Sequence, residues 1–458
     1  MNTTVSPSEP GAMVPYENSK AGAIGFTDTV ATLVIFLYWL VYENIVFFYS
    51  MESGGTVLLV LTNSIKLFLP FGLLLYTGLP PIRLLARGYT SLYIAFFVAF
   101  LFWGLIPTLI SGDPLAWFKL LPRFVFFLSV LSFFFKRPVA FRLFAKCMVL
   151  YVLSALLQYI LIYVTGAYDS TVGVDYARLA GPMGLLGNVT SMMRFAGSPF
   201  PFIRLTGFWN EPSNASGSAF AAFYLARYLV AIGERPRWRM ASYGCLVAGI
   251  LALSTAGYFA FFAALTWSLL FGVGKVTAGR VFRFALSLSI AAALMGIVVF
   301  GRTYVYDNLP DNVWARAITG ARDFDDKADD VTSGRLDLAK TTIETSVSGF
   351  IGVGIQEVGS EGIEGPATAP LFWLLLTGFP GLGLLLCREA VLLTAMRSIV
   401  VGRPAMLLLT QALIVVVAQH LSYGTWMNPN YFILAAMVLS CAQKGTLHPF
   451  ASNRFHER

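Results

Sequence analysis

The residues that could carry chemistry are concentrated in one stretch of the chain, RLTGFWNEPSNASG. Its arginine, Arg204, offers a planar fork that pairs with phosphate oxygens, and its carboxylate, Glu211, can take a proton from a hydroxyl group. The ring of Trp209 can stack against a sugar, and Asn210 and Ser213 add hydrogen-bonding groups nearby. Because phosphate, sugar and hydroxyl groups occur together in phosphorylated glycolipids, the stretch predicts a site for such a ligand.

A structural interpretation of the same stretch stays open. Asn210 can cap a helix, while Glu211 and Pro212 suit its first turn, where a carboxylate complements the helix dipole. The small residues 215–217 allow another helix to pack closely. On this interpretation the stretch is simply the start of a membrane helix.

A second group of candidates is formed by Ser333, Gly334 and Arg335. Ser333 can cap a helix that carries Arg335 in its first turn, where free backbone N–H groups and a guanidinium together suit a phosphate. Asp337, in the same predicted helix, is a further candidate base. The alternative for Arg335 is an arginine on a solvated face.

Glycines and acidic residues flank this second group. Gly352 and Gly354, in GFIGVG, let the backbone approach a ligand closely. The acidic run from Asp323 to Asp330 lacks the spacing of a calcium loop, so we interpret it as a solvated loop. The sequence therefore predicts no metal and no cofactor.

Four ionisable residues fall within stretches that are otherwise apolar, namely Lys66, Lys119, Arg123 and His420. Ionisable groups at membrane depth are costly, which makes each a functional candidate. We assign Lys119 and Arg123 to the phosphate and His420 to the base as secondary candidates. Snorkelling of the two cations and a helix-end role for the histidine are the alternatives.

The elements that must position these residues are membrane helices. Of 458 residues, 57% are hydrophobic and only 12% are charged, and the mean hydropathy is +0.70. A soluble protein cannot hide that much apolar surface in one core. Apolar runs long enough to cross a hydrocarbon core about 30 Å thick predict an all-α polytopic membrane protein with about twelve spans. The predicted spans lie near residues 28–49, 55–77, 90–110, 115–134, 147–166, 212–232, 240–254, 258–273, 284–300, 368–387, 404–422 and 429–442.

Lysine and arginine occupy every second connection between these spans, which orients the chain. Cytoplasmic loops retain these residues, so both termini are predicted in the cytoplasm. The predicted division is a cytoplasmic tail at 1–27, a membrane domain at 28–442 with large outer segments at 166–211 and 301–368, and a second cytoplasmic tail at 443–458.

The net charge, the cysteines and the first residues of the chain are consistent with this topology. The net charge of +8 follows from the basic cytoplasmic connections and predicts no nucleic-acid partner. The four cysteines fall in or beside apolar spans, which favours neither disulfides nor a zinc site. The first 27 residues do not resemble a cleavable signal peptide.

Taken in order, these motifs resemble the bacterial O-antigen polymerase and O-antigen ligase superfamily. The resemblance rests on the spans, on RLTGFWNEPSNASG, on LALSTAGYFAFF from Leu251, on TSGR and GFIGVGIQEVG in a large outer loop, and on LLLTGFPGLGLLL from Leu374. It covers roughly residues 204–386. It implies an architecture like that of the GT-C type membrane glycosyltransferases.

Two positions depart from the pattern of that family. Members often have Ser-Arg where this chain has Ser254 and Thr255, which leaves one arginine unaccounted for. Ligases carry a histidine upstream of the glycine matched by Gly378, in the neighbourhood of Ala367 here. The absence of that histidine favours a polymerase over a ligase.

The resemblance implies metal-independent, inverting glycosyl transfer at the periplasmic face of the bacterial inner membrane. Donor and acceptor would both be undecaprenyl-pyrophosphate-linked glycans, and the other implied partners are membrane lipid and a chain-length regulator. Arg204 and Arg335 can stabilise the departing pyrophosphate without magnesium. Glu211 is the first candidate for the base, followed by His420 and Asp337.

Two other functions stay open. A ligase, which passes the finished glycan to lipid A core or protein, would share the fold and the donor site. A transporter or flippase of lipid-linked oligosaccharides would share the membrane architecture without the chemistry.

Overall fold

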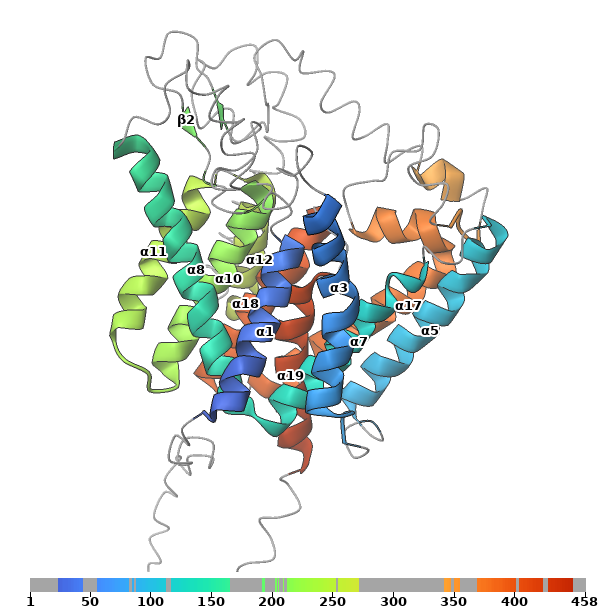
Figure 1. Ribbon diagram of the computed structural model, residues 1–458, viewed down its shortest axis with the longest axis horizontal. Coiled ribbons are helices and arrows are strands. Elements are labelled where there is room, and N and C mark those ends of the chain that lie inside the picture. Colours follow the sequence, from blue (N-terminus) through green and yellow to red (C-terminus); the bar gives the residue numbers. More distant parts are fainter. Residues whose placement is uncertain are drawn as a thin grey trace, which may run out of the picture.

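The computed structural model describes residues 24–43, 56–81, 85, 88–112, 117–164, 192–193, 202–203, 205, 209, 212–252, 254–271, 342–346, 350–354, 369–400, 403–422 and 427–447. The helices in this part of the chain are α1 (Phe26–Glu43), α3 (Thr56–Thr77), α5 (Tyr89–Ile110), α7 (Leu121–Lys136), α8 (Pro138–Val164), α10 (Pro212–Ala231), α11 (Arg237–Leu251), α12 (Thr255–Phe271), α17 (Ala369–Val400), α18 (Pro404–Ser422) and α19 (Pro429–Leu447) (Figure 1). Two short strands, β1 (Met192–Met193) and β2 (Phe202–Ile203), pair antiparallel.

Four of these helices contain stretches long and apolar enough to cross a membrane: Tyr89–Ile110, Pro138–Leu161, Ala369–Val400 and Pro404–Leu421. The prediction of a helical protein embedded in a membrane is supported at this level. The count of about twelve spans and the GT-C type architecture stay predictions. The predicted span at 284–300 lies outside the described residues.

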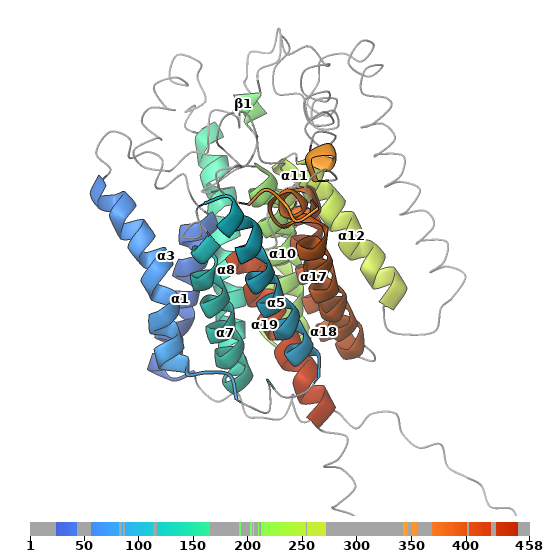
Figure 2. The ribbon, with the colours of Figure 1, turned by 90° about the vertical axis from the view of Figure 1, so that its right-hand side faces the viewer.

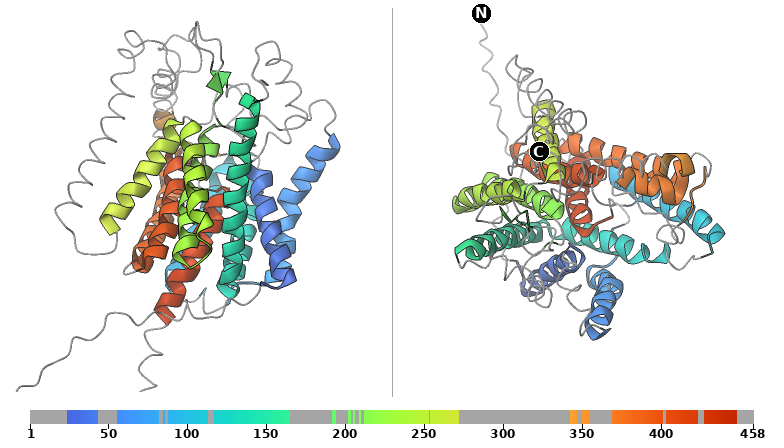
Figure 3. Two further views of the ribbon diagram at one scale, coloured as in Figure 1. Left: turned by 90° about the vertical axis from the view of Figure 1, so that its left-hand side faces the viewer. Right: turned by 90° about the horizontal axis from the view of Figure 1, so that it is seen from above.

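The described helices form a bundle (Figures 2 and 3). Its centre is buried and its exterior carries exposed apolar side chains. α10 and α19 are buried along most of their length. Helices at the periphery instead expose large apolar side chains, such as Leu75 of α3 and Phe102 of α5. Helices that are apolar on their outward faces are what a bilayer requires, because lipid replaces water there.

The two ends of the bundle bring together the segments that alternate crossing predicts. At one end, the Lys146 ammonium lies 2.8 Å from a Glu234 carboxylate oxygen, which ties the start of α8 to the connection after α10. At the other end, the Leu205 N–H donates to the Leu251 carbonyl at 3.0 Å. One predicted boundary is wrong: α8 begins at Pro138, so Lys146 lies on a helix and not in the connection before it.

A kink divides α17. Gly378 has a φ of 66°, which breaks the helix. Pro380 has no N–H, so the carbonyl of Leu376 has no donor within the helix. The N–H of Phe379 donates to another segment and leaves the carbonyl of Leu375 free as well. Two adjacent carbonyl groups therefore need partners from elsewhere.

Segment 350–354 supplies those partners. The N–H groups of Val353 and Gly354 donate to the two freed carbonyl groups at 2.9 and 3.1 Å. The next carbonyl along α17, that of Thr377, accepts a hydrogen bond of 2.8 Å from the indole of Trp103 in α5. An unsatisfied backbone group in a bilayer costs several kcal/mol. The hydrogen bonds from segment 350–354 and from Trp103 of α5 therefore stabilise the kink by satisfying its carbonyl groups.

Two glycines of segment 350–354 are required for its close approach to α17 and α5. A Cβ on Gly352 would lie 2.5 Å from the Gly378 nitrogen, and a Cβ on Gly354 would lie 2.8 Å from the Pro107 carbonyl oxygen. Gly352 and Gly354 also have positive φ values of 96° and 78°. The close backbone approach predicted for these two glycines is therefore to other backbone in this structure, and their approach to a ligand stays a prediction.

We expect Gly378→Ala to lower the thermal unfolding temperature of the purified protein in detergent. The φ and ψ of Gly378 lie in a region that essentially only glycine occupies, so alanine there costs about 1–3 kcal/mol. Its Cβ would also overlap segment 350–354. Gly383→Ala is the matched control in the same helix, because a Cβ there meets nothing within 4 Å. That variant should unfold no earlier than the wild type. Equal unfolding temperatures for the two variants would contradict the role of the kink.

Candidate functional site

The candidate site lies where the first turn of α10 meets the last turn of α18. α10 begins at Pro212, whose fixed φ suits the start of a helix. Small residues then bring its neighbours close: the Ser216 hydroxyl donates to the Gly249 carbonyl of α11 at 3.1 Å. A Cβ on Gly217 would overlap the side-chain amide of Gln419 in α18. The close helix packing predicted for this stretch is therefore confirmed.

Polar side chains join the two helices at this point. The Gln419 amide nitrogen donates to the Ser213 carbonyl and to the Asn214 side-chain oxygen, both at 3.0 Å. The next residue, His420, has its Nε2 3.3 Å from the side-chain nitrogen of Asn428. These two sets of contacts are neighbours because Gln419 and His420 are consecutive residues, and Ser213 takes part through its backbone carbonyl. We call the residues together the α10–α18 cluster: Ser213, Asn214, Gln419, His420 and Asn428.

His420 is the member of this cluster with proton-transfer chemistry. Its side chain is almost fully buried, and within the described residues its Nδ1 has no hydrogen-bond partner. A buried polar atom of this kind is costly unless a partner is supplied. The Asn428 amide nitrogen can only donate, so Nε2 is the accepting nitrogen of the neutral ring and Nδ1 carries its proton. The nitrogen that could take the proton of a hydroxyl group is therefore Nε2, once its contact with Asn428 is released.

Trp209 is described, and it lies in the protein core. Its ring centroid is 4.9 Å from that of Tyr151 and 6.4 Å from that of Trp39. The indole is fully buried. It packs the start of the α10 region against α1 and α8, and its predicted contact with a sugar stays a prediction.

The two cations of the fourth predicted span lie apart from the α10–α18 cluster. Arg123 of α7 places its guanidinium 5.2 Å from the ring centroid of Tyr42 in α1. The ammonium of Lys66 in α3 is 4.9 Å from the centroid of the same ring. Lys119 is exposed. The structure therefore pairs Arg123 with Lys66, a combination that the sequence did not indicate.

The remaining predicted site residues are not all described. Gly352 and Gly354 lie at the kink of α17. The residues that fall outside the described part of the chain are Arg204, Asn210, Glu211, Ser333, Gly334, Arg335 and Asp337. The described residues 342–346, a little further along, are helical, as predicted for the segment that follows Ser333.

A buried ion pair in α17 was missed by the sequence analysis. The Arg388 guanidinium donates to Glu389 Oε1 from Nε at 2.9 Å and from a terminal nitrogen at 2.5 Å. The Tyr431 hydroxyl of α19 lies 2.8 Å from both carboxylate oxygens, and the Tyr93 hydroxyl of α5 is 3.0 Å from that of Tyr431. The pair and its two tyrosines link three helices.

Aromatic rings complete the surroundings of this arginine. The Arg388 guanidinium lies 5.4 Å from the ring centroid of Tyr93, 5.0 Å from that of Phe97 and 5.3 Å from that of Tyr431. Arg388 is fully buried. Cation–π contacts of this kind gain strength when they are desolvated. Since both charges have partners, we interpret the pair as a structural clasp between α5, α17 and α19.

Removing one charge of this pair should destabilise the protein more than removing both charges. Glu389→Leu leaves a buried arginine without its carboxylate, a change that costs about 3–5 kcal/mol in comparable buried pairs. The double variant Arg388→Met with Glu389→Leu has no buried charge and should recover most of that loss. Thermal unfolding of the purified variants in detergent measures both effects. A double variant less stable than Glu389→Leu alone would contradict the clasp.

The site is interpreted from its geometry, because comparison with known protein sequences found no match. No family model matches the chain, and no curated protein sequence matches it. Within the described residues, no group of three or more His, Cys, Asp or Glu side chains is placed to hold a metal ion.

Proposed function

We propose that the chain is a membrane glycosyltransferase that polymerises undecaprenyl-pyrophosphate-linked repeat units at the periplasmic face of the bacterial inner membrane. One observation carries the proposal. The stretch with the arginine, the carboxylate and the aromatic residues leads directly into the start of α10, where the structure holds a buried histidine beside fixed amide groups. In the chain, the candidate phosphate-binding stretch therefore immediately precedes the helix that contacts the residue next to the candidate base, which supports the proposal.

The proposed reaction needs three protein contributions. The acceptor hydroxyl attacks the anomeric carbon of the donor sugar while the bond from that carbon to the pyrophosphate oxygen breaks, which inverts the configuration. A base takes the hydroxyl proton, and Glu211 and His420 are the candidates. Arg204 and Arg335 stabilise the negative charge that develops on the departing pyrophosphate.

His420 gains support as a base from its surroundings. Its Nε2 accepts a hydrogen bond from the Asn428 amide and so is the nitrogen with a lone pair for a proton, while its protonated Nδ1 is buried without a partner in the described part of the chain. The neighbouring Gln419 is anchored to Ser213 and Asn214 on the facing helix. Anchoring of this kind holds a reactive group in one position, which lowers the entropic cost of reaching the transition state.

The test is a deletion of the gene in its own bacterium, followed by complementation with variants. We expect the deletion strain to carry only single repeat units on its surface glycan, because polymerisation is lost while transfer to the final acceptor continues. Arg204→Ala and Arg335→Ala should fail to restore chain length, and His420→Ala should shorten the chains strongly, since loss of a general base lowers the rate about 10²–10⁴-fold. Gel electrophoresis of surface glycan measures chain length.

Arg403→Ala serves as a control, because this exposed cation lies at the opposite end of α18. It should restore the wild-type pattern, and all variants should reach wild-type abundance in the membrane. Accumulation of long lipid-linked polymer in the deletion strain would instead identify a ligase. Repeat units trapped facing the cytoplasm would identify a flippase. Either result would overturn the proposal.

A further inference from the structure

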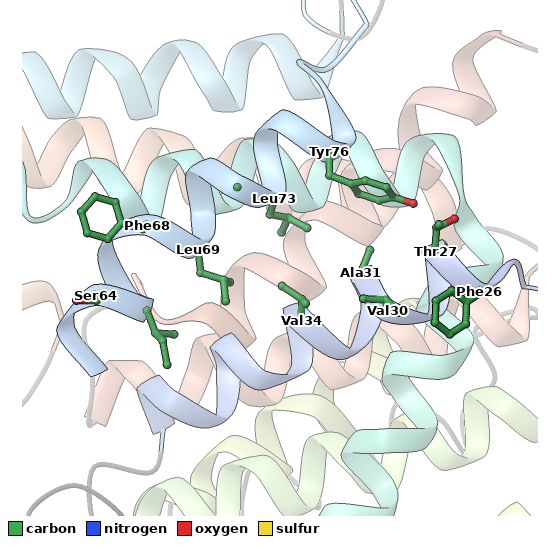
Figure 4. A pocket seen from close by; sticks show the side chains of 12 residues that line it. Phe26, Thr27, Val30, Ala31, Val34, Ser64, Phe68, Leu69, Leu73 and Tyr76 are labelled. Atoms are coloured by element: carbon green, nitrogen blue, oxygen red, sulfur yellow. The ribbon is translucent and has the colours of Figure 1, made fainter. Parts of the chain in front are cut away.

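A groove between α1 and α3 lies away from the α10–α18 cluster. It has a volume of about 640 Å³ and is lined almost entirely by apolar side chains of the two helices, among them Val34, Leu69 and Leu73 (Figure 4). Gly72 forms part of its wall, and a Cβ there would meet nothing within 4 Å. A side chain at position 72 therefore has open space at its first carbon, beside the groove.

The groove opens toward the exterior of the bundle. Phe68 and Tyr76 of α3, which line it, are 65% and 50% exposed, and Val30 of α1 is 43% exposed. In a membrane protein, apolar side chains exposed on an outer helix face the hydrocarbon chains of the lipid. The walls of this groove thus suit an acyl chain.

One end of the groove lies beside two cations that share an aromatic ring. Ser64 and Ile65 line this end, and the next residue of α3 is Lys66. Lys66 and Arg123 both contact the ring of Tyr42, as described above. Neither cation has a carboxylate partner among the described side chains, and the Nε of Arg123 is buried without a hydrogen-bond partner there.

At the opposite end of the groove, one of two cations has a carboxylate partner. Arg137 lies 3.3 Å from the Asp28 carboxylate, and the Tyr76 hydroxyl contacts the same carboxylate at 3.4 Å. Lys136 donates its hydrogen bond to the Thr77 carbonyl at 2.5 Å. The carbonyl does not neutralise the Lys136 charge, but among the described residues the end with Lys66 and Arg123 places two cations without a carboxylate at one ring, which favours this end for the phosphate of an anionic ligand.

We propose that this groove binds an anionic phospholipid of the bilayer. Lys66 and Arg123 bind its phosphate, and one of its acyl chains lies along α1 and α3. Two cations without a carboxylate are costly at membrane depth, and a lipid phosphate supplies the missing charge. Basic pockets between membrane helices bind lipid headgroups on the same principle. The inference does not rest on the proposed glycosyltransferase activity, because the groove and the α10–α18 cluster are built from different helices.

The test is native mass spectrometry of the purified full-length protein with added phosphatidylglycerol or phosphatidylcholine. We expect the wild type to retain one phosphatidylglycerol molecule in preference to the zwitterionic lipid. The double variant Lys66→Gln with Arg123→Gln should lower the affinity for phosphatidylglycerol about thirtyfold, since each cation near a lipid phosphate contributes about fivefold. Gly72→Phe should abolish retention by filling the groove, with both cations left in place.

Two variants serve as matched controls. Gly383→Phe adds the same ring at a glycine with open space around it on α17, and Arg403→Gln removes an exposed cation elsewhere. Both should retain phosphatidylglycerol as the wild type does. The proposal is overturned if Gly72→Phe retains the lipid, if the charge variant binds it unchanged, or if both lipids bind equally. It is also overturned if an equimolar polyprenyl phosphate displaces phosphatidylglycerol, because the groove would then be a substrate site.

Discussion

The hydrocarbon interior of a bilayer offers no water, so each polar group of a membrane helix needs a partner inside the protein. The kink of α17 shows how the chain meets this constraint. Pro380 and the bend at Gly378 release carbonyl groups, and segment 350–354 and Trp103 supply donors for them. The buried pair of Arg388 and Glu389 meets the same constraint through the tyrosines of two neighbouring helices. These contacts fix α5, α17 and α19 relative to one another.

Because of the same constraint, buried polar groups that lack partners indicate where a ligand could bind. At the α10–α18 cluster, the amide of Gln419 is held by α10, whereas one nitrogen of His420 has no partner in the described part of the chain. At the groove between α1 and α3, Lys66 and Arg123 share a tyrosine ring and no described carboxylate. Buried polar groups without partners cost free energy, and sites that bind a ligand supply the partner when the ligand arrives. The first place is where we propose chemistry, and the second is where we propose a lipid.

Much of the helix layout could be predicted from the sequence, because long apolar runs and alternating basic connections follow directly from the thickness and the charge asymmetry of a membrane. The start of α10 at Pro212 and its close packing through Ser216 and Gly217 were predicted from local chemistry. The contact of Ser213 with the residue before His420 was not, since it joins residues far apart in the chain. Likewise, no local sequence pattern indicates that Lys66 and Arg123 contact the same aromatic ring.

The end of the tenth predicted span lies too early in the chain, and the reason is physical. Arg388 and Glu389 follow an apolar run, and charged residues ordinarily end a membrane span, so the span was placed at 368–387. The structure continues the helix to Val400 and buries both charges, because each neutralises the other and Tyr431 adds a hydrogen bond. Only the apolar residues that follow Glu389 could have indicated this, and the partners themselves come from other helices.

The central claim is that the end of the bundle formed by α10 and α18 joins lipid-linked repeat units without a metal. The most direct measurement is reconstitution of the purified protein in liposomes with an undecaprenyl-pyrophosphate-linked repeat unit as the sole glycan and a chelator in the buffer. We predict lipid-linked polymer with inverted anomeric configuration at each new bond, detected by mass spectrometry. Repeat units that stay unchanged with folded wild-type protein, or polymer that forms only after a divalent metal is added, would contradict the claim.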